Sequence, residues 1–113
     1  MKRGEIWVAN LNPIRGREFG KIRPVLIVHA DELIAAGAPV IVVLPVTSRV
    51  RTGLHLLRVA IPSRDRLREP GQIVVDQPRS LDRARLGDGP LTQLSAGEMR
   101  AVDRGMRVAL GLY

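Results

Sequence analysis

The sequence contains no cysteine and very few aromatic side chains, with Trp7, Phe19 and Tyr113 as its only tryptophan, phenylalanine and tyrosine. The absence of cysteine excludes disulfide bonds and thiolate metal sites, which suits a reducing compartment. Because rings are scarce, aliphatic side chains must fill the core. At 113 residues and 45% hydrophobic content, the chain has the length of a single domain with a modest core.

Long hydrophobic runs are also absent. The longest apolar run, at 40–44, is far too short to cross a bilayer and is typical of a buried strand. The N-terminus carries Lys2 and Arg3, but no apolar stretch follows them, so it does not resemble a signal peptide. These features predict a cytoplasmic protein with no membrane association.

Positive charge dominates the composition. Eighteen Lys and Arg residues face eleven Asp and Glu residues, giving a formal net charge of +7, and all the basic residues except Lys2 and Lys21 are arginine. A genome rich in GC explains the choice of arginine over lysine, but it does not explain the net excess. A domain this basic attracts polyanions, and the planar arginine fork matches phosphate geometry. We therefore expect a nucleic-acid partner, with RNA favoured.

The pattern of apolar and polar residues predicts strands at 5–10, 24–29, 40–46, 54–61 and 72–76. Short helical turns are expected at 31–36 and 81–86, and the sequence Gly-Asp-Gly-Pro at 87–90 indicates a break. Ser95 and Glu98 have the spacing of a capping box, which predicts an amphipathic helix from Ser95 onward with arginines on its outer face. The chain is therefore expected to form one α+β domain over residues 1–113, dominated by a twisted antiparallel sheet.

Most familiar catalytic and metal-binding patterns are missing from the sequence. The stretch from Gly16 to Lys21 is one residue short of a phosphate-binding P-loop, and Ile22 replaces the hydroxyl that binds magnesium. His29 and His55 lack metal-ligand spacing; they either pair as acid and base or serve as structural histidines. We accordingly expect no metal and no cofactor.

Five segments, in order along the chain, carry a more specific signal. They read Arg3-Gly-Glu-Ile-Trp7, Asn12-Pro13 followed by Gly16-x-Glu18, Arg23-Pro24-Val-Leu-Ile-Val28, Leu44-Pro-Val-Thr-Ser48 and Asp76-Gln-Pro-Arg-Ser-Leu-Asp82. Together they span nearly the whole chain and resemble the MazF/PemK/Kid family of bacterial toxin endoribonucleases. The amphipathic C-terminal helix is similar to the family's as well.

This resemblance implies an SH3-like, PemK/CcdB-type plasmid-toxin barrel: a strongly curved antiparallel sheet with short helices and a last helix packed against it. It implies the toxin of a type II toxin–antitoxin system, a homodimer that cleaves single-stranded mRNA without ribosome or metal. In such a reaction the 2′-hydroxyl attacks the adjacent phosphate and leaves 2′,3′-cyclic phosphate and 5′-hydroxyl ends. The implied protein partner is an acidic, MazE-like antitoxin whose disordered C-terminal tail occupies the same groove.

The resemblance also assigns catalytic residues. Arg23 matches the family's catalytic arginine and Thr47 its catalytic threonine, and a guanidinium with a hydroxyl suits stabilisation of a charged phosphate. The Kid branch instead uses a histidine, an arginine and an aspartate. Here Arg17 and Val74 occupy the first two of those positions and only Asp76 is retained, which favours the pair Arg23 and Thr47.

A further set of residues is expected to bind RNA. Gln77 and Arg79 match the family's substrate-binding segment, where an amide reads a base edge and an arginine grips a phosphate. Asp76 either contacts a base edge or pairs with one of the many arginines. The complete set comprises Arg17, Glu18, Lys21, Ser48, Arg49, Asp76, Gln77 and Arg79.

Two other functions remain open at this level. CcdB-like toxins share the fold, poison DNA gyrase and cleave nothing, whereas a non-catalytic RNA-binding module would hold RNA without chemistry. The arginines at 63–69 and in the C-terminal helix are expected farther from the site, where they are assigned to the solvated surface, to nonspecific attraction or to antitoxin contact.

Overall fold

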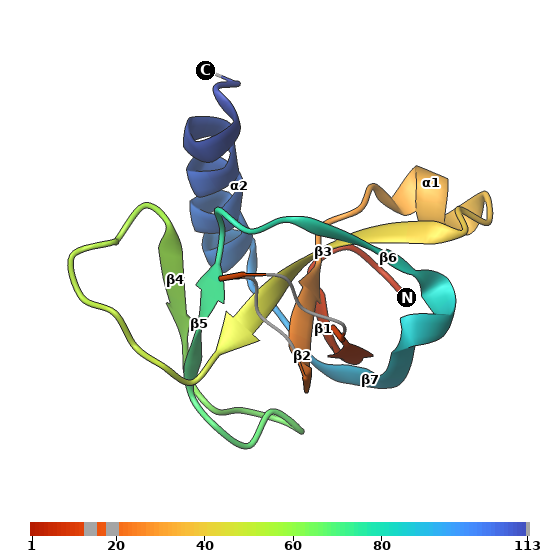
Figure 1. Cartoon of the computed structure of the whole chain (residues 1–113), viewed down its shortest axis with the longest axis horizontal. Helices are drawn as coiled ribbons and strands as arrows, with labels where there is room; N and C mark the ends of the chain where they lie inside the picture. The colour runs from red at the N-terminus through yellow and green to blue at the C-terminus, as the bar shows by residue number, and fades with distance from the viewer. Residues whose placement is uncertain (13–15, 18–20, 113) are drawn as a thin grey trace.

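The computed structural model describes residues 1–12, 16–17 and 21–112 (Figure 1). Its elements follow one another as β1 (Glu5–Asn10), β2 (Ile22–Ile27), α1 (Asp31–Ala35), β3 (Val40–Thr47), β4 (Arg58–Ile61), β5 (Gly71–Val74), β6 (Arg79–Asp82), the 3-10 turn η1 (Arg83–Arg85), β7 (Leu86–Gln93) and α2 (Ala96–Leu110). Among the described residues, no helix combines the length and apolar character that a membrane crossing requires.

The strands form an antiparallel sheet in the order β4-β5-β3-β2-β1-β7, with β6 paired to β3. Strand β3 is central to this arrangement, because its first half pairs with β6 while Val46 and Thr47 at its end pair with β5. Since β3 serves two partners on one edge, the sheet curves along it (Figure 1). The α+β fold expected from the sequence, a strongly curved antiparallel sheet with a C-terminal helix, is confirmed.

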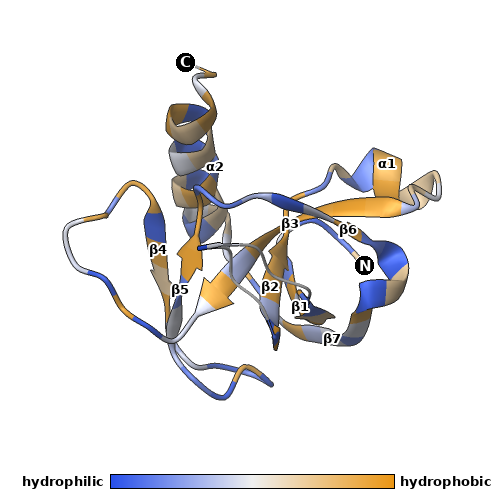
Figure 2. Ribbon diagram, in the orientation of Figure 1, coloured by the Kyte–Doolittle hydropathy of each residue, from blue (hydrophilic) through white to orange (hydrophobic). Residues whose placement is uncertain are grey.

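Both faces of the sheet are buried at its centre, which explains the continuous apolar runs in β2 and β3 (Figure 2). Side chains alternate between two hydrophobic clusters: Leu26 and Leu44 belong to one, and Val25 and Val43 to the other. Helix α2 covers the first cluster through its buried residue Val102. The two clusters hold β2 and β3 in a fixed register beneath the site described below.

The capping box predicted for α2 is present. The Ser95 hydroxyl accepts a hydrogen bond from the Glu98 amide at 3.2 Å, and the Glu98 carboxylate accepts one from the Ser95 amide at 2.9 Å. Gly105 stands in the middle of the helix because a Cβ there would lie 2.3 Å from the Leu56 carbonyl oxygen. The helix therefore packs closely on the segment that precedes β4.

Several predicted boundaries are wrong. The break expected at 87–90 lies inside β7, which pairs with β1 through two register shifts. Gly89 is there because a Cβ would lie 2.3 Å from the Trp7 ring, which is a packing requirement rather than a turn. At 81–86 only Arg83–Arg85 are helical, since Leu81 and Asp82 complete β6. Residues 54–57 form a turn closed by the Leu57 amide and the Leu54 carbonyl, so this strand begins at Arg58.

Candidate active site

Arg23 on β2 and Thr47 at the end of β3 line one cavity of about 470 Å³. The strands pair antiparallel with Val25 opposite Pro45, and continuing that register by two residues sets Arg23 opposite Thr47. Opposite residues in such a pair share a face of the sheet, so both side chains reach the same space. Ser48 and the segment from Arg66 to Gly71 line the rest of the cavity's polar wall.

Thr47 is almost fully buried, with 3% of its surface exposed, although it borders the cavity. Its Oγ1 accepts a hydrogen bond from the Arg49 amide at 3.1 Å. That bond uses a lone pair of the hydroxyl, whose own hydrogen can still be donated. The geometry thus fixes the hydroxyl and leaves it able to donate a hydrogen bond to an oxygen in the cavity.

The electrostatics of the cavity favour an anion. Burial lowers the pKa of Arg23, and the nearby positive charge of Arg49 lowers it further. Both causes disfavour the positive charge of Arg23, so a phosphate bound beside the two arginines would stabilise that charge. Ser48 and Arg49 are exposed beside this position.

Gln72 is a buried polar residue that sequence reasoning did not single out. It is 8% exposed, and its Oε1 accepts a hydrogen bond from the Arg51 amide at 3.0 Å while its Nε2 donates one to the Arg51 carbonyl at 3.3 Å. A glutamine in a short apolar strand carries no sequence signal of such a contact, because its partner lies 21 residues away.

Arg66 and Arg68 are exposed, as expected, but the expectation that they lie away from the site is wrong, because both line the cavity with Arg23 and Thr47. Leu67 between them is buried in the core, and the Arg66 amide donates to the Leu91 carbonyl on β7 at 2.9 Å. The Arg66 guanidinium also pairs with Asp88 at 2.9 Å. These contacts fold the β4–β5 loop over the end of β3, which local sequence does not reveal.

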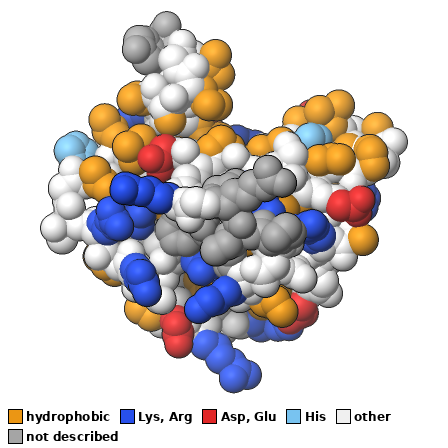
Figure 3. Space-filling view, in the orientation of Figure 1, with side chains coloured by type: hydrophobic (Ala, Val, Ile, Leu, Met, Phe, Trp, Pro, Cys, Tyr) orange, Lys and Arg blue, Asp and Glu red, His pale blue; other side chains and the backbone are white. Residues whose placement is uncertain are grey.

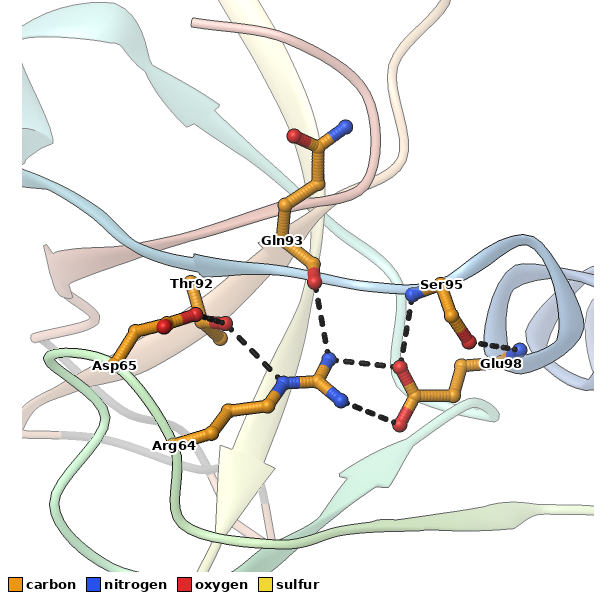
Figure 4. Close-up of polar contacts among 6 residues, drawn as sticks. All are labelled: Arg64, Asp65, Thr92, Gln93, Ser95 and Glu98. Carbon is orange, nitrogen blue, oxygen red and sulfur yellow. Dashed lines mark hydrogen bonds and ion pairs between the residues drawn. The ribbon is translucent and has the colours of Figure 1, made fainter.

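The same loop is attached to α2 through Arg64 (Figure 4). The Arg64 guanidinium binds the Glu98 carboxylate through two hydrogen bonds of 2.9 and 2.7 Å and also donates to the Thr92 hydroxyl and the Gln93 carbonyl. The hydrogen bond with Arg64 is the largest of the effects that lower the pKa of Glu98. The cavity wall is therefore tied to the first turn of the helix.

A second cavity, of about 320 Å³, brings together Arg17, Gln77 and Arg79. Its floor includes Val43 and Pro45, and Thr47 lies two residues further along the same face of β3, since side chains alternate in a strand. The lining of this cavity includes Leu11 and Val43 of one hydrophobic cluster, whereas the first cavity includes Val46 and Leu91 of the other, so the two cavities lie mainly on different faces of the sheet. The Arg79 guanidinium donates to the Leu11 carbonyl, which fixes the side chain at the cavity edge. Lys and Arg side chains gather on the face that Figure 3 shows.

The remaining candidate residues lie at the edges of these cavities or apart from them. Lys21 is exposed, and its amide donates to the Asn12 side chain at 2.9 Å. Asp76 is exposed and is not among the described residues that line either cavity. Its negative charge raises the pKa of Arg58, although the larger effect of burial lowers it. Glu18 lies outside the described residues.

The two histidines have no common site. His29 Nδ1 accepts a hydrogen bond from the Val42 amide at 3.1 Å, which gives it a structural role between β2 and β3. His55 lies exposed in the turn before β4. Within residues 1–12, 16–17 and 21–112, no group of three or more His, Asp or Glu residues has an arrangement that could hold a metal ion.

Fold and site together define a small basic protein with arginine-lined cavities at the end of a curved sheet. A family model described as the PemK-like, MazF-like toxin of type II toxin–antitoxin systems matches residues 2–110. The chain belongs to this family.

Individual relatives agree with the assignment. The endoribonuclease MazF of Staphylococcus saprophyticus is 34% identical over 117 residues, covering 100% of this chain and 93% of the relative. The crystal structure of MazF from Deinococcus radiodurans superposes with a TM-score of 0.83 at 25% identity, covering 98% of this chain and 96% of that one. A mycobacterial endoribonuclease in complex with its cognate antitoxin gives a TM-score of 0.79 at 24% identity, covering 100% and 97%.

Proposed function

We propose that this protein is the toxin of a type II toxin–antitoxin system and an endoribonuclease that cleaves single-stranded mRNA at specific sequences. The observation that carries the proposal is the shared cavity of Arg23 and Thr47, with Arg49 beside them. Membership of the toxin family and the 34% identity to an endoribonuclease support it. Because the substrate is mRNA, the activity belongs to the cytoplasm.

In the proposed reaction the 2′-oxygen attacks the adjacent phosphorus, the bond from phosphorus to the 5′-oxygen breaks, and the 2′-proton passes to a base in solution or in the complex. The departing 5′-oxygen takes up a proton, so the products are a 2′,3′-cyclic phosphate and a 5′-hydroxyl. Arg23 stays charged, because a guanidinium is not deprotonated in proteins, and it stabilises the phosphate oxygens together with the Thr47 hydroxyl. We propose that the reaction is metal-independent, with arginine supplying the positive charge.

The second cavity is assigned to substrate recognition. Gln77 offers an amide to a base edge, while Arg17 and Arg79 offer guanidinium groups to phosphates or base faces. An RNA strand that passes around the end of β3, where Thr47 and Ser48 lie, would reach both cavities. Ser48, Arg49 and Lys21 are placed at the edges of the same path.

We further propose two protein partners. An acidic, MazE-like antitoxin with a disordered C-terminal tail would occupy the arginine-lined cavities and compete with RNA, and a structurally similar mycobacterial endoribonuclease is in complex with its cognate antitoxin. A second copy of the chain would complete a homodimer, as the family resemblance implies.

A cleavage assay tests the proposal. Purified protein is incubated with a long single-stranded RNA in EDTA, and cut ends are mapped by primer extension. We expect cleavage at a short recurring sequence, reduced on the order of 10²–10³-fold by Arg23→Ala and by Thr47→Ala. Arg104→Ala, which removes the same charge from the exposed face of α2, should cleave like the parent.

Each other outcome has a defined meaning. A parent protein that binds RNA without cutting it would indicate a binding module. Cleavage that survives both cavity substitutions would remove Arg23 and Thr47 from the mechanism. Gyrase-dependent DNA breaks with intact RNA would indicate a CcdB-like toxin.

A further inference from the structure

Gln72 lies on β5 between β4 and β3, and its amide makes hydrogen bonds to the segment that follows β3 and to Arg58 of β4. On β5 it stands directly opposite Thr47 of β3 and Ala60 of β4. Residues opposite each other share a face, so the Gln72 amide projects on the same face of the sheet as Thr47. A buried amide is destabilising unless it is hydrogen-bonded, and both the oxygen and the nitrogen of this one make hydrogen bonds to the segment that follows Thr47.

The Gln72 side chain contacts both the amide and the carbonyl of Arg51. Gln72 Oε1 accepts from the Arg51 amide and Gln72 Nε2 donates to the Arg51 carbonyl, as a neighbouring strand would. At the other end of the segment, the Thr47 hydroxyl accepts from the Arg49 amide. Residues 47–51 are thus held at both ends by side chains from the site, and Arg49 lies between the two anchors.

The charges in this segment oppose its compact arrangement. The positive charge of Arg49 lowers the pKa of Arg23, in addition to the larger effect of burial. In the same way, the charge of Arg51 adds to the effect of burial and lowers the pKa of Arg58. Arg58 Nη1 donates to both Gln72 Oε1 and the Arg49 carbonyl, at 3.4 Å each. Without an anion, repulsion among these arginines favours an open segment, and the Gln72 hydrogen bonds oppose that opening.

We propose that Gln72 is a positioning residue, whose side-chain amide holds residues 49–51 so that Arg49 faces the phosphate bound by Arg23. The inference rests on the proposed ribonuclease function. Gln72 acts through the backbone of Arg51 and does not contact the RNA. A neutral amide suits this role, because a carboxylate would keep the acceptor but add a negative charge beside the phosphate.

Two substitutions test the role. Gln72→Leu removes both hydrogen bonds, and we expect faster amide hydrogen exchange at Arg49 and Arg51 in the RNA-free protein. We also expect a loss of about 10–100-fold in kcat/KM for RNA cleavage, because displaced groups lose their alignment. Gln93→Leu, at an exposed glutamine of β7, is the matched control and should change neither quantity.

Gln72→Glu separates positioning from folding. It keeps the acceptor for the Arg51 amide and for Arg58 but loses the donor to the Arg51 carbonyl, and because its added charge lies beside the Arg58 guanidinium, the variant should remain folded, which thermal unfolding checks. Binding of an uncleavable 2′-deoxy-substituted oligonucleotide should nevertheless weaken by about 10-fold or more, because one carboxylate opposes several phosphate contacts.

The outcomes distinguish the positioning role of Gln72 from the proposed ribonuclease function. Unchanged exchange at Arg51 in Gln72→Leu, or unchanged kcat/KM despite faster exchange, would overturn the positioning role. Unchanged oligonucleotide binding in Gln72→Glu would overturn it as well. If the parent binds the oligonucleotide but cleaves no RNA, the ribonuclease assignment fails, while weaker binding by both variants would still support Gln72 as the residue that positions Arg49.

Discussion

Gly71 offers a sharp test of the geometry around Thr47. A Cβ added at this position would lie 2.6 Å from the Thr47 carbonyl oxygen and 3.3 Å from a methyl group of Val46. Ordinary contacts between heavy atoms begin near about 3.5 Å, so Gly71→Ala must push β5 and the end of β3 apart by roughly 0.9 Å. The obstructing atom belongs to the backbone and cannot rotate away.

The expected cost has two parts. Overpacking of this kind destabilises a protein by about 1–3 kcal/mol. For a domain of this size that corresponds to a fall in melting temperature of roughly 4 °C or more. Because a displacement near 1 Å can cost about 10²-fold in rate, kcat/KM for RNA cleavage should fall about 10–100-fold at temperatures where the variant is fully folded.

Thermal unfolding gives the melting temperature of each protein, and RNA cleavage is then compared at one temperature at which both proteins are fully folded. Gly87→Ala is the matched control, since among the described residues other than its chain neighbours no atom lies within 4 Å of a Cβ at that position of β7. If Gly71→Ala melts and cleaves like the control, the packing argument is wrong. Lost stability with undiminished cleavage would show that the placement of Thr47 does not govern activity.

Three further predictions follow from other contacts. Gly105→Ala should destabilise the fold by about 1–3 kcal/mol in urea unfolding despite a better helix propensity, since its Cβ would meet the Leu56 carbonyl; equal or greater stability would refute this. The pKa of Glu98 lies below its ordinary value of 4.5, so its pair with Arg64 adds stability above that pH and loses it as pH falls through the folded pKa. Glu98→Gln should flatten this acid limb in pH-dependent melting, and a limb of unchanged slope would argue against the pair. Arg49→Gln should reduce the slope of log affinity for single-stranded RNA against log salt by about 0.7, and no change would place Arg49 away from phosphate.

Local patterns were sufficient for much of the fold. The capping box of Ser95 and Glu98 predicted the start of α2, and apolar runs predicted β2 and β3, because these signals lie within a few residues of each other. Strand β7 was not predicted because its Gly89 is required by close packing on the Trp7 ring, which is distant in sequence and comes near only in the folded chain. The pairing of β7 with β1 therefore depends on tertiary packing and cannot be predicted from the local sequence.

In the candidate site, too, some residues could be predicted from the sequence, whereas others depend on contacts between distant segments. Arg23 and Thr47 were selected through family motifs, and the strand register places both on one cavity. Arg66 and Arg68 were missed because their position depends on a loop that folds back onto β7. Gln72 was missed because its function, as proposed, lies in the backbone that it holds and not in its own chemistry.

The single carboxylate of Glu98 has a consequence for cooperativity. Its Oε1 accepts both the Ser95 amide of the helix cap and the Arg64 guanidinium of the β4–β5 loop, at 2.9 and 2.7 Å. Releasing the loop therefore also weakens the first turn of α2, so the two segments should open as one unit rather than independently. In hydrogen exchange, the amides at the start of α2 and those anchoring the loop should share a common opening free energy, and a denaturant that frays the helix should uncover the arginine-lined cavity at the same concentration.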